Sequence, residues 1–120
     1  MLGLTLSFFI FGLGVPMQIK PGVQLNGIRP EIVAAIPVVQ SVYAQQGYLL
    51  TITSGVEGKH SSKKSLHYKG LALDFRTRHV PKAKRPALHR ALKSALGSQY
   101  DVILHASHLH VEWDGGGVNL

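Results

Sequence analysis

Residues 108–113 alternate strictly between polar and apolar side chains, in the order His-Leu-His-Val-Glu-Trp. Successive side chains of a β-strand point to opposite faces of a sheet, so this alternation predicts a strand with one buried face and one open face. Leu109, Val111 and Trp113 are expected in the core. The open face is expected to carry the polar residues His108, His110 and Glu112. The chain therefore needs a sheet that leaves one of its faces available for chemistry.

The remaining periodicities predict two helices and three further strands. Apolar residues recur at helical spacing after Pro30 as far as Gly47, and Pro37 should bend this helix. A second helix is expected over residues 81–96, or only from Pro86 onward. Short branched, apolar runs predict strands over residues 49–53, 71–75 and 100–104. This order of elements predicts an α+β domain, a small antiparallel sheet with helices packed on it.

The chain has 120 residues and no cysteine. This length points to one domain with its own core. The lack of cysteine excludes disulfides, thiolate metal ligands and cysteine nucleophiles. Any metal ion must therefore be held by His, Asp or Glu. The domain is expected over residues 28–114, with residues 115–120 as a flexible, glycine-rich tail.

Residues 1–17 are almost wholly apolar, and residues 18–27 read as an irregular entry to the domain. The apolar segment has the length of a signal-peptide core but lacks a positive start and a clear cleavage site. It is also short for a membrane span. Two interpretations stay open, namely export or membrane contact through residues 1–17, and a buried strand or a misassigned start site.

Two separate segments carry the residues best suited to bind a metal ion or to take part in catalysis. His67 precedes a predicted strand and Asp74 lies on it, and Gly70 between them lets the chain turn. His108 and His110 share one face of the last strand. Two imidazoles and one carboxylate, with a fourth position left to water, are typical of a catalytic zinc site. His79 and His89 are expected at the surface.

These segments together match a known pattern, Ser-x-His-x-x-Gly-x-Ala-x-Asp followed late in the chain by His-x-His. The chain resembles the LAS-type zinc peptidases over roughly residues 28–114. That superfamily contains D-alanyl-D-alanine carboxypeptidases, D-Ala-D-Ala dipeptidases and phage L-alanyl-D-glutamate endolysins, and it shares its fold with hedgehog signalling domains. The pattern is matched at Ser65, His67, Gly70, Ala72, Asp74, His108 and His110. The resemblance implies a hedgehog/DD-peptidase-like fold.

The resemblance also implies one zinc ion and a set of ligands. The implied ligands are His67, Asp74 and His110. Many relatives have an acidic general base three residues before the last histidine, where this chain has Ser107. The spacing of His105, His108 and His110 is instead similar to the penicillin-insensitive murein endopeptidases. An imidazole titrates near neutral pH, so His108 or His105 is the expected base.

The formal charge of +7 attracts polyanions, either nucleic acid or an anionic bacterial wall. No aromatic residues interleave with the basic ones, so no nucleic-acid partner is expected. The resemblance implies peptidoglycan stem peptides, cut at a D-Ala-containing bond or at L-Ala-D-Glu. Residues expected to contact them are Lys59, His60, Ser65, Arg76 and Glu112.

The chain is therefore expected to be a monomeric zinc peptidase, either a carboxypeptidase or an endopeptidase. It would act at the bacterial wall as an exported, phage-delivered or virion-associated protein. The alternative is a non-catalytic metal-binding or wall-binding protein of the same fold. Ser107 favours this alternative, whereas the complete ligand set and the histidine pair favour the enzyme.

Overall fold

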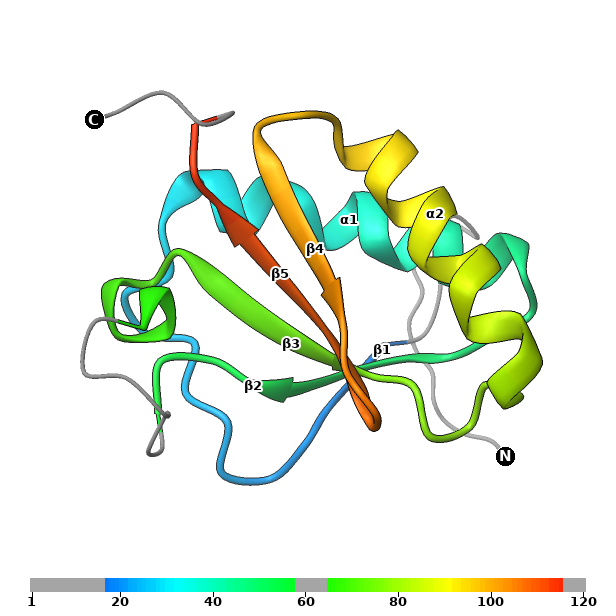
Figure 1. The fold of residues 1–120 in the computed structure, drawn as a ribbon. Helices are drawn as coiled ribbons and strands as arrows, with labels where there is room; N and C mark the ends of the chain where they lie inside the picture. Colours follow the sequence, from blue (N-terminus) through cyan, green and yellow to red (C-terminus); the bar gives the residue numbers. More distant parts are fainter. Residues whose placement is uncertain (1–16, 58–64, 116–120) are drawn as a thin grey trace, which may run out of the picture.

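A computed structural model describes residues 17–57 and 65–115 of the chain (Figure 1). Within them, the protein is an α+β domain of five strands, two α-helices and two short 3₁₀ helices. The elements in chain order are β1 (Met17–Ile19), α1 (Pro30–Gln45), β2 (Leu50–Ser54), η2 (Leu66–Lys69), β3 (Ala72–Arg76), η3 (Lys82–Lys84), α2 (Arg85–Leu96), β4 (Tyr100–Leu104) and β5 (His108–Trp113).

The sheet is mixed, so the expectation of an antiparallel sheet is wrong at one edge. Its strand order is β1-β2-β3-β5-β4, in which β1 pairs parallel to β2 and the other pairs are antiparallel. Strand β1 joins the last residue of the apolar segment, Met17, to Gln18 and Ile19 of the stretch expected to be irregular. It has only three residues, all exposed, so no alternation marks it in the sequence. Its pairing joins Met17 to Leu50, 33 residues apart, through backbone hydrogen bonds.

Both helices cover one face of the sheet (Figure 1). Helix α1 continues through Pro37, whose side chain is exposed. Helix α2 begins at Arg85, after the 3₁₀ turn η3, with Pro86 in its first turn, where a backbone N–H is not needed. The helices bury Val39, Tyr43, Leu88 and Leu92 against the sheet. No helix in the described part of the chain is long and apolar enough to cross a membrane.

Strands β3 and β5 supply the centre of the sheet with the predicted two-faced pattern. Leu73 and Phe75 of β3 are buried, as are Leu109 and Val111 of β5. Trp113 was expected in the core, but it is only partly buried against it because it ends the strand. The polar residues between them lie on the face away from the helices. The sheet thus presents one open face, and this face holds the candidate site.

Gly70 shapes the turn that enters β3. Its φ is +72°, and it caps η2 in the left-handed conformation. A Cβ atom at this position would overlap the carbonyl oxygen of Gly27, and the carbonyl of Gly70 accepts a hydrogen bond from Arg29 N at 2.9 Å. Only glycine therefore satisfies both the dihedral angle and the close approach of the backbone.

Candidate metal centre

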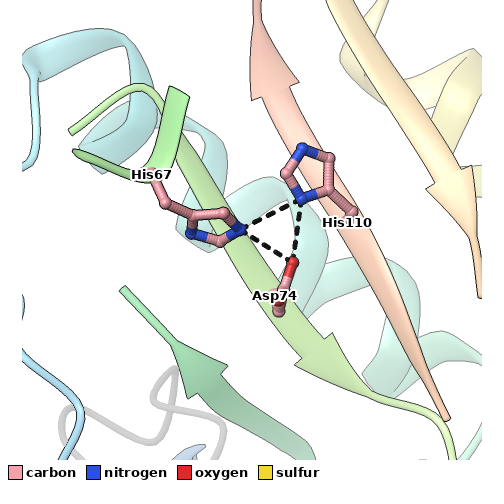
Figure 2. A group of neighbouring side chains, drawn as sticks. All are labelled: His67, Asp74 and His110. Atoms are coloured by element: carbon pink, nitrogen blue, oxygen red, sulfur yellow. Dashed lines mark hydrogen bonds and ion pairs between the residues drawn. The ribbon is translucent and has the colours of Figure 1, made fainter. Parts of the chain in front are cut away.

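Three side chains from different elements converge on the open face of the sheet (Figure 2). His67 Nε2 lies 3.2 Å from Asp74 Oδ1 and 3.1 Å from His110 Nδ1. His110 Nδ1 lies 2.9 Å from Asp74 Oδ1, which closes the triangle. Asp74 and His110 are direct Cα partners of β3 and β5, so the sheet register brings them together. His67 reaches the same point from η2.

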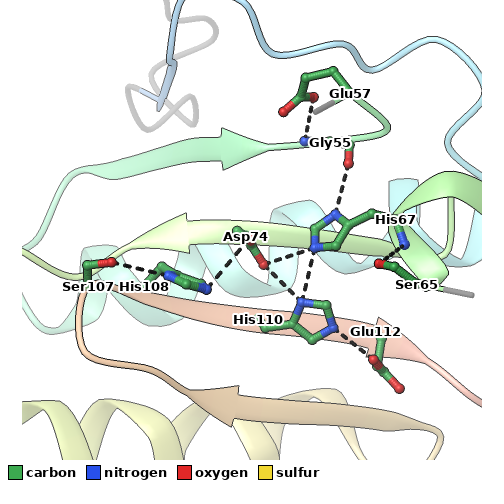
Figure 3. Close-up of polar contacts among 9 residues, drawn as sticks. All are labelled: Gly55, Glu57, Ser65, His67, Asp74, Ser107, His108, His110 and Glu112. Carbon is green, nitrogen blue, oxygen red and sulfur yellow. Dashed lines mark hydrogen bonds and ion pairs between the residues drawn. The ribbon is translucent and has the colours of Figure 1, made fainter. Parts of the chain in front are cut away.

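Contacts on the outer side of each imidazole fix which nitrogen carries the hydrogen (Figure 3). His67 Nδ1 lies 2.8 Å from the carbonyl oxygen of Gly55, and His110 Nε2 lies 2.8 Å from Glu112 Oε1. Both oxygens are acceptors, so the outer nitrogens donate. In the neutral rings, the inner nitrogens then keep their lone pairs. Metal-ligating histidines are commonly fixed in this way by an outer acceptor.

The geometry of the three inner atoms fits a metal ion. Ligand atoms of a tetrahedral zinc at about 2.1 Å are separated by about 3.4 Å. The separations of 2.9–3.2 Å observed here are close to that value. Two lone pairs and a carboxylate oxygen at this distance repel one another unless a cation or a shared proton lies between them. His67, Asp74 and His110 could therefore hold a metal ion.

The same contacts shift the protonation of the site. Burial raises the pKa of Asp74, but hydrogen bonds with His110 and His67, formed when an inner nitrogen carries a proton, outweigh it and hold this pKa well below its usual range. Burial lowers the pKa of His110, but hydrogen bonds to Asp74 and Glu112 reverse the effect and raise it. Asp74 is thus anionic near neutral pH, and a proton on His110 would compete with a metal ion at this group.

His67, which was expected only to precede a strand, lies in a short helix of its own. His67 lies in η2 and is buried, and its backbone N–H donates to Ser65 Oγ at 3.2 Å. Its partner Gly55 follows a β-bulge in β2, where the register slips between Ile52 and Ser54. Glu57 Oε1 accepts hydrogen bonds from Gly55 N at 2.8 Å and Gln24 N at 2.9 Å.

Glu57 therefore fixes the backbone that orients His67. Burial raises the pKa of the Glu57 carboxyl group, but the backbone hydrogen bonds outweigh burial and lower this pKa. No sequence pattern pointed to Glu57 as a support of the site or to the Gly55 carbonyl as the partner of His67. Gly55 lies twelve residues before His67, and only the folded chain brings its carbonyl to the ring.

The histidines expected to act as base lie beside this centre. His108 Nε2 lies 3.7 Å from Asp74 Oδ2, and His108 Nδ1 lies 3.3 Å from Ser107 Oγ. The ring of His105 stacks on that of His108, with centroids 4.6 Å apart. Burial lowers the pKa of His108, an effect that the carboxylate of Asp74 only partly offsets. His108 is thus held at the centre as a mainly neutral imidazole at neutral pH.

Two adjoining cavities open at the centre, and both include Asp74 and His108. One, of about 270 Å³, is lined by Ser65, His67, Asp74, Ile103, His105, His108 and His110. The other, of about 180 Å³, is lined by Lys20, Thr53, Ser54, Asp74, Arg76, Arg78, Ser107 and His108. Arg76 therefore lies beside the centre, together with Lys20 and Arg78, two cations that were not among the expected residues.

Within the described part of the chain, the remaining residues selected from the sequence do not line either cavity. Glu112 accepts a hydrogen bond from the outer nitrogen of His110 and so orients the ring of a candidate ligand. Lys59 and His60 lie outside the described residues. His79 is exposed as expected, whereas His89 is half-buried, with its Nε2 2.6 Å from the carbonyl oxygen of Val102.

A second group of acidic residues lies at the end of the same face. Asp101, Glu112 and Asp114 bring carboxylate oxygens within 4.8 Å of one another. The pKa of Asp101 is raised mainly by a hydrogen bond with Asp114 and, to a smaller extent, by burial. This group has no imidazole and includes the exposed Asp101, so it is a weaker candidate for a transition metal than the His67/Asp74/His110 group.

No protein-family model matches the chain, and no curated protein sequence matches it either.

Proposed function

We propose that the chain is a zinc-dependent peptidase that hydrolyses peptidoglycan stem peptides, at a D-Ala-containing bond or at L-Ala-D-Glu. One observation carries the proposal. Two imidazoles whose outer nitrogens are engaged by acceptors hold their inner nitrogens 3.2 Å and 2.9 Å from one carboxylate oxygen, on the open face of a sheet. This ligand set suits zinc, and three protein ligands leave a position for water. The preference for peptidoglycan follows from the motif resemblance.

Residues beside the centre supply the proton chemistry that hydrolysis needs. Zinc, when bound, supplies Lewis-acid activation of a carbonyl and of a water molecule. His108 has its Nε2 beside Asp74, and its pKa is lowered by burial, so it can accept the proton of the attacking water. It then returns that proton to the leaving amine. Stacking against His105 and the contact with Ser107 hold the ring in place.

The smaller cavity suggests how the substrate is attracted. Lys20, Arg76 and Arg78 line it next to Asp74. Stem peptides carry free carboxylates, which these three cations would attract and orient. An extended peptide could lie along the open face of the sheet, from the smaller, basic cavity across the centre. Arg76 and Arg78 are therefore proposed to contact a substrate carboxylate.

Digestion of purified muropeptides, with the products identified by mass, tests the proposal. The zinc-loaded protein should release a product whose mass identifies a single cleaved peptide bond. His108→Ala should lose most of this activity with its zinc content unchanged. Val33→Ala changes an exposed residue of α1 and serves as the matched control. A zinc-loaded parent that cleaves no muropeptide would refute the proposed enzyme.

The second candidate is a metal-binding protein that attaches to the wall without catalysis. Ser107 favours it, because a serine hydroxyl cannot replace a carboxylate as a base at neutral pH. This candidate predicts one zinc per chain and co-sedimentation with isolated murein sacculi, with no soluble product. The same mass analysis of the supernatant separates the two candidates.

A further inference from the structure

Ile103 is the one apolar side chain that lines the larger cavity of the candidate centre within the described residues. It belongs to the edge strand β4, and its Cα is the direct partner of His110 in β5. The other residues that line this cavity are serine, histidine or aspartate. Ile103 is 43% exposed, although isoleucine is among the residues most often buried.

Packing of the fold does not account for this isoleucine. Val102, its neighbour in β4, points to the helices and is buried, whereas Ile103 lies on the opposite face, with the metal-ligand candidates. Asp101, two residues earlier on that face, is polar and exposed, and so is His105, two residues later. The sheet face is therefore polar on either side of Ile103 along the strand.

The position of Ile103 limits what can contact it. Neighbouring strands are about 4.8 Å apart, so the side chain of Ile103 begins roughly one strand away from the ligand His110. A peptide with its scissile carbonyl at the centre can place there only the side chain of a residue that flanks the scissile bond. A cavity of about 270 Å³ suits a short peptide segment.

We propose that Ile103 forms an apolar subsite for a small, uncharged side chain, the methyl group of an alanine that flanks the scissile bond. This inference rests on the proposed peptidase function and names a residue that determines its specificity. A methyl group would bury apolar surface against Ile103, whereas a charged side chain would lose water against the isoleucine. Burial of one methyl group is worth about a 4-fold preference over glycine.

Two synthetic stem peptides that differ only in alanine or glycine at the flanking residue test this inference. The parent should cleave the alanine peptide with a kcat/KM about 4-fold or more above that of the glycine peptide. In Ile103→Ala this ratio should fall toward one, with zinc content and Tm unchanged. Val33→Ala, at another exposed apolar residue, should keep the parental ratio. An unchanged ratio in Ile103→Ala would overturn the inference while the peptidase function stands.

A binding measurement decides the case in which the parent cleaves neither peptide. The zinc-loaded protein, labelled with ¹³C at its isoleucine methyl groups, is titrated with each peptide, and the Ile103 resonance is assigned from its loss in Ile103→Ala. A shift that is larger with the alanine peptide supports the subsite even if the peptidase function has failed. An Ile103 resonance that moves with neither peptide overturns the inference.

Discussion

Replacement of Asp74 by asparagine should remove the stabilisation that zinc gives to the protein. Asp74 contributes the one anionic atom of the proposed ligand set, 3.2 Å from His67 Nε2 and 2.9 Å from His110 Nδ1. The amide has almost the same shape but carries no charge. Because the hydrogen bonds of Asp74 also matter without metal, the quantity to compare is the zinc-induced change in Tm, rather than Tm itself.

The size of this change follows from linkage. A ligand at 100 times its Kd stabilises the native state by about 2.7 kcal/mol. Unfolding entropies of about 2.1 cal/mol/K per residue give ~0.25 kcal/mol/K for 120 residues. Zinc should therefore raise the parental Tm by about 10 °C. If asparagine weakens binding by more than about 100-fold, the same zinc concentration yields less than ~0.4 kcal/mol, and the shift falls below ~2 °C.

Scanning calorimetry at pH 8 with buffered zinc measures this shift. The alkaline pH matters because the raised pKa of His110 favours a proton that competes with the metal ion, so the shift should shrink as the pH falls toward 6. Asp101→Asn is the matched control, since Asp101 is exposed on the same sheet face within the second acidic group. A parental shift in Asp74→Asn together with its loss in Asp101→Asn would place the ion at that acidic group and refute our assignment.

Three further predictions concern the base, the support of His67 and the turn before β3. His108→Ala or His105→Ala should lower turnover about 100-fold with zinc retained. Parental activity should rise with pH through a value below about 6.5, because burial lowers the pKa of His108. Parental rates in both variants would exclude these two residues as the base. Glu57→Gln should weaken zinc binding about 10-fold or more in a competition titration. Gly70→Ala should lower the free energy of unfolding, measured by urea denaturation, by more than ~2 kcal/mol. Gly47 is also left-handed but has open space around it, so Gly47→Ala should lower the same free energy by only ~1 kcal/mol.

Local periodicity predicted the parts of the fold that depend on burial of one face. The alternation along β5 correctly predicted the buried Leu109 and Val111, and helical spacing predicted α1. The parallel strand β1 was missed because its three exposed residues pair only through the backbone. The 3₁₀ helix around His67 was missed because its cap, the hydroxyl of Ser65, is a contact between neighbours that no periodicity marks.

The candidate ligands were accessible from the sequence, but the geometry that makes them ligands was not. Asp74 and His110 are residue types that bind metals, and they become direct neighbours on one face of the sheet when β3 pairs with β5. The direction of the lone pair on His67 depends instead on the carbonyl of Gly55, which β2 and its bulge carry to the ring. Outer contacts of this kind tune metal affinity by 10- to 100-fold without contributing a ligand atom. A chain with the same motif but without this carbonyl would therefore keep the ligand pattern and still bind zinc more weakly.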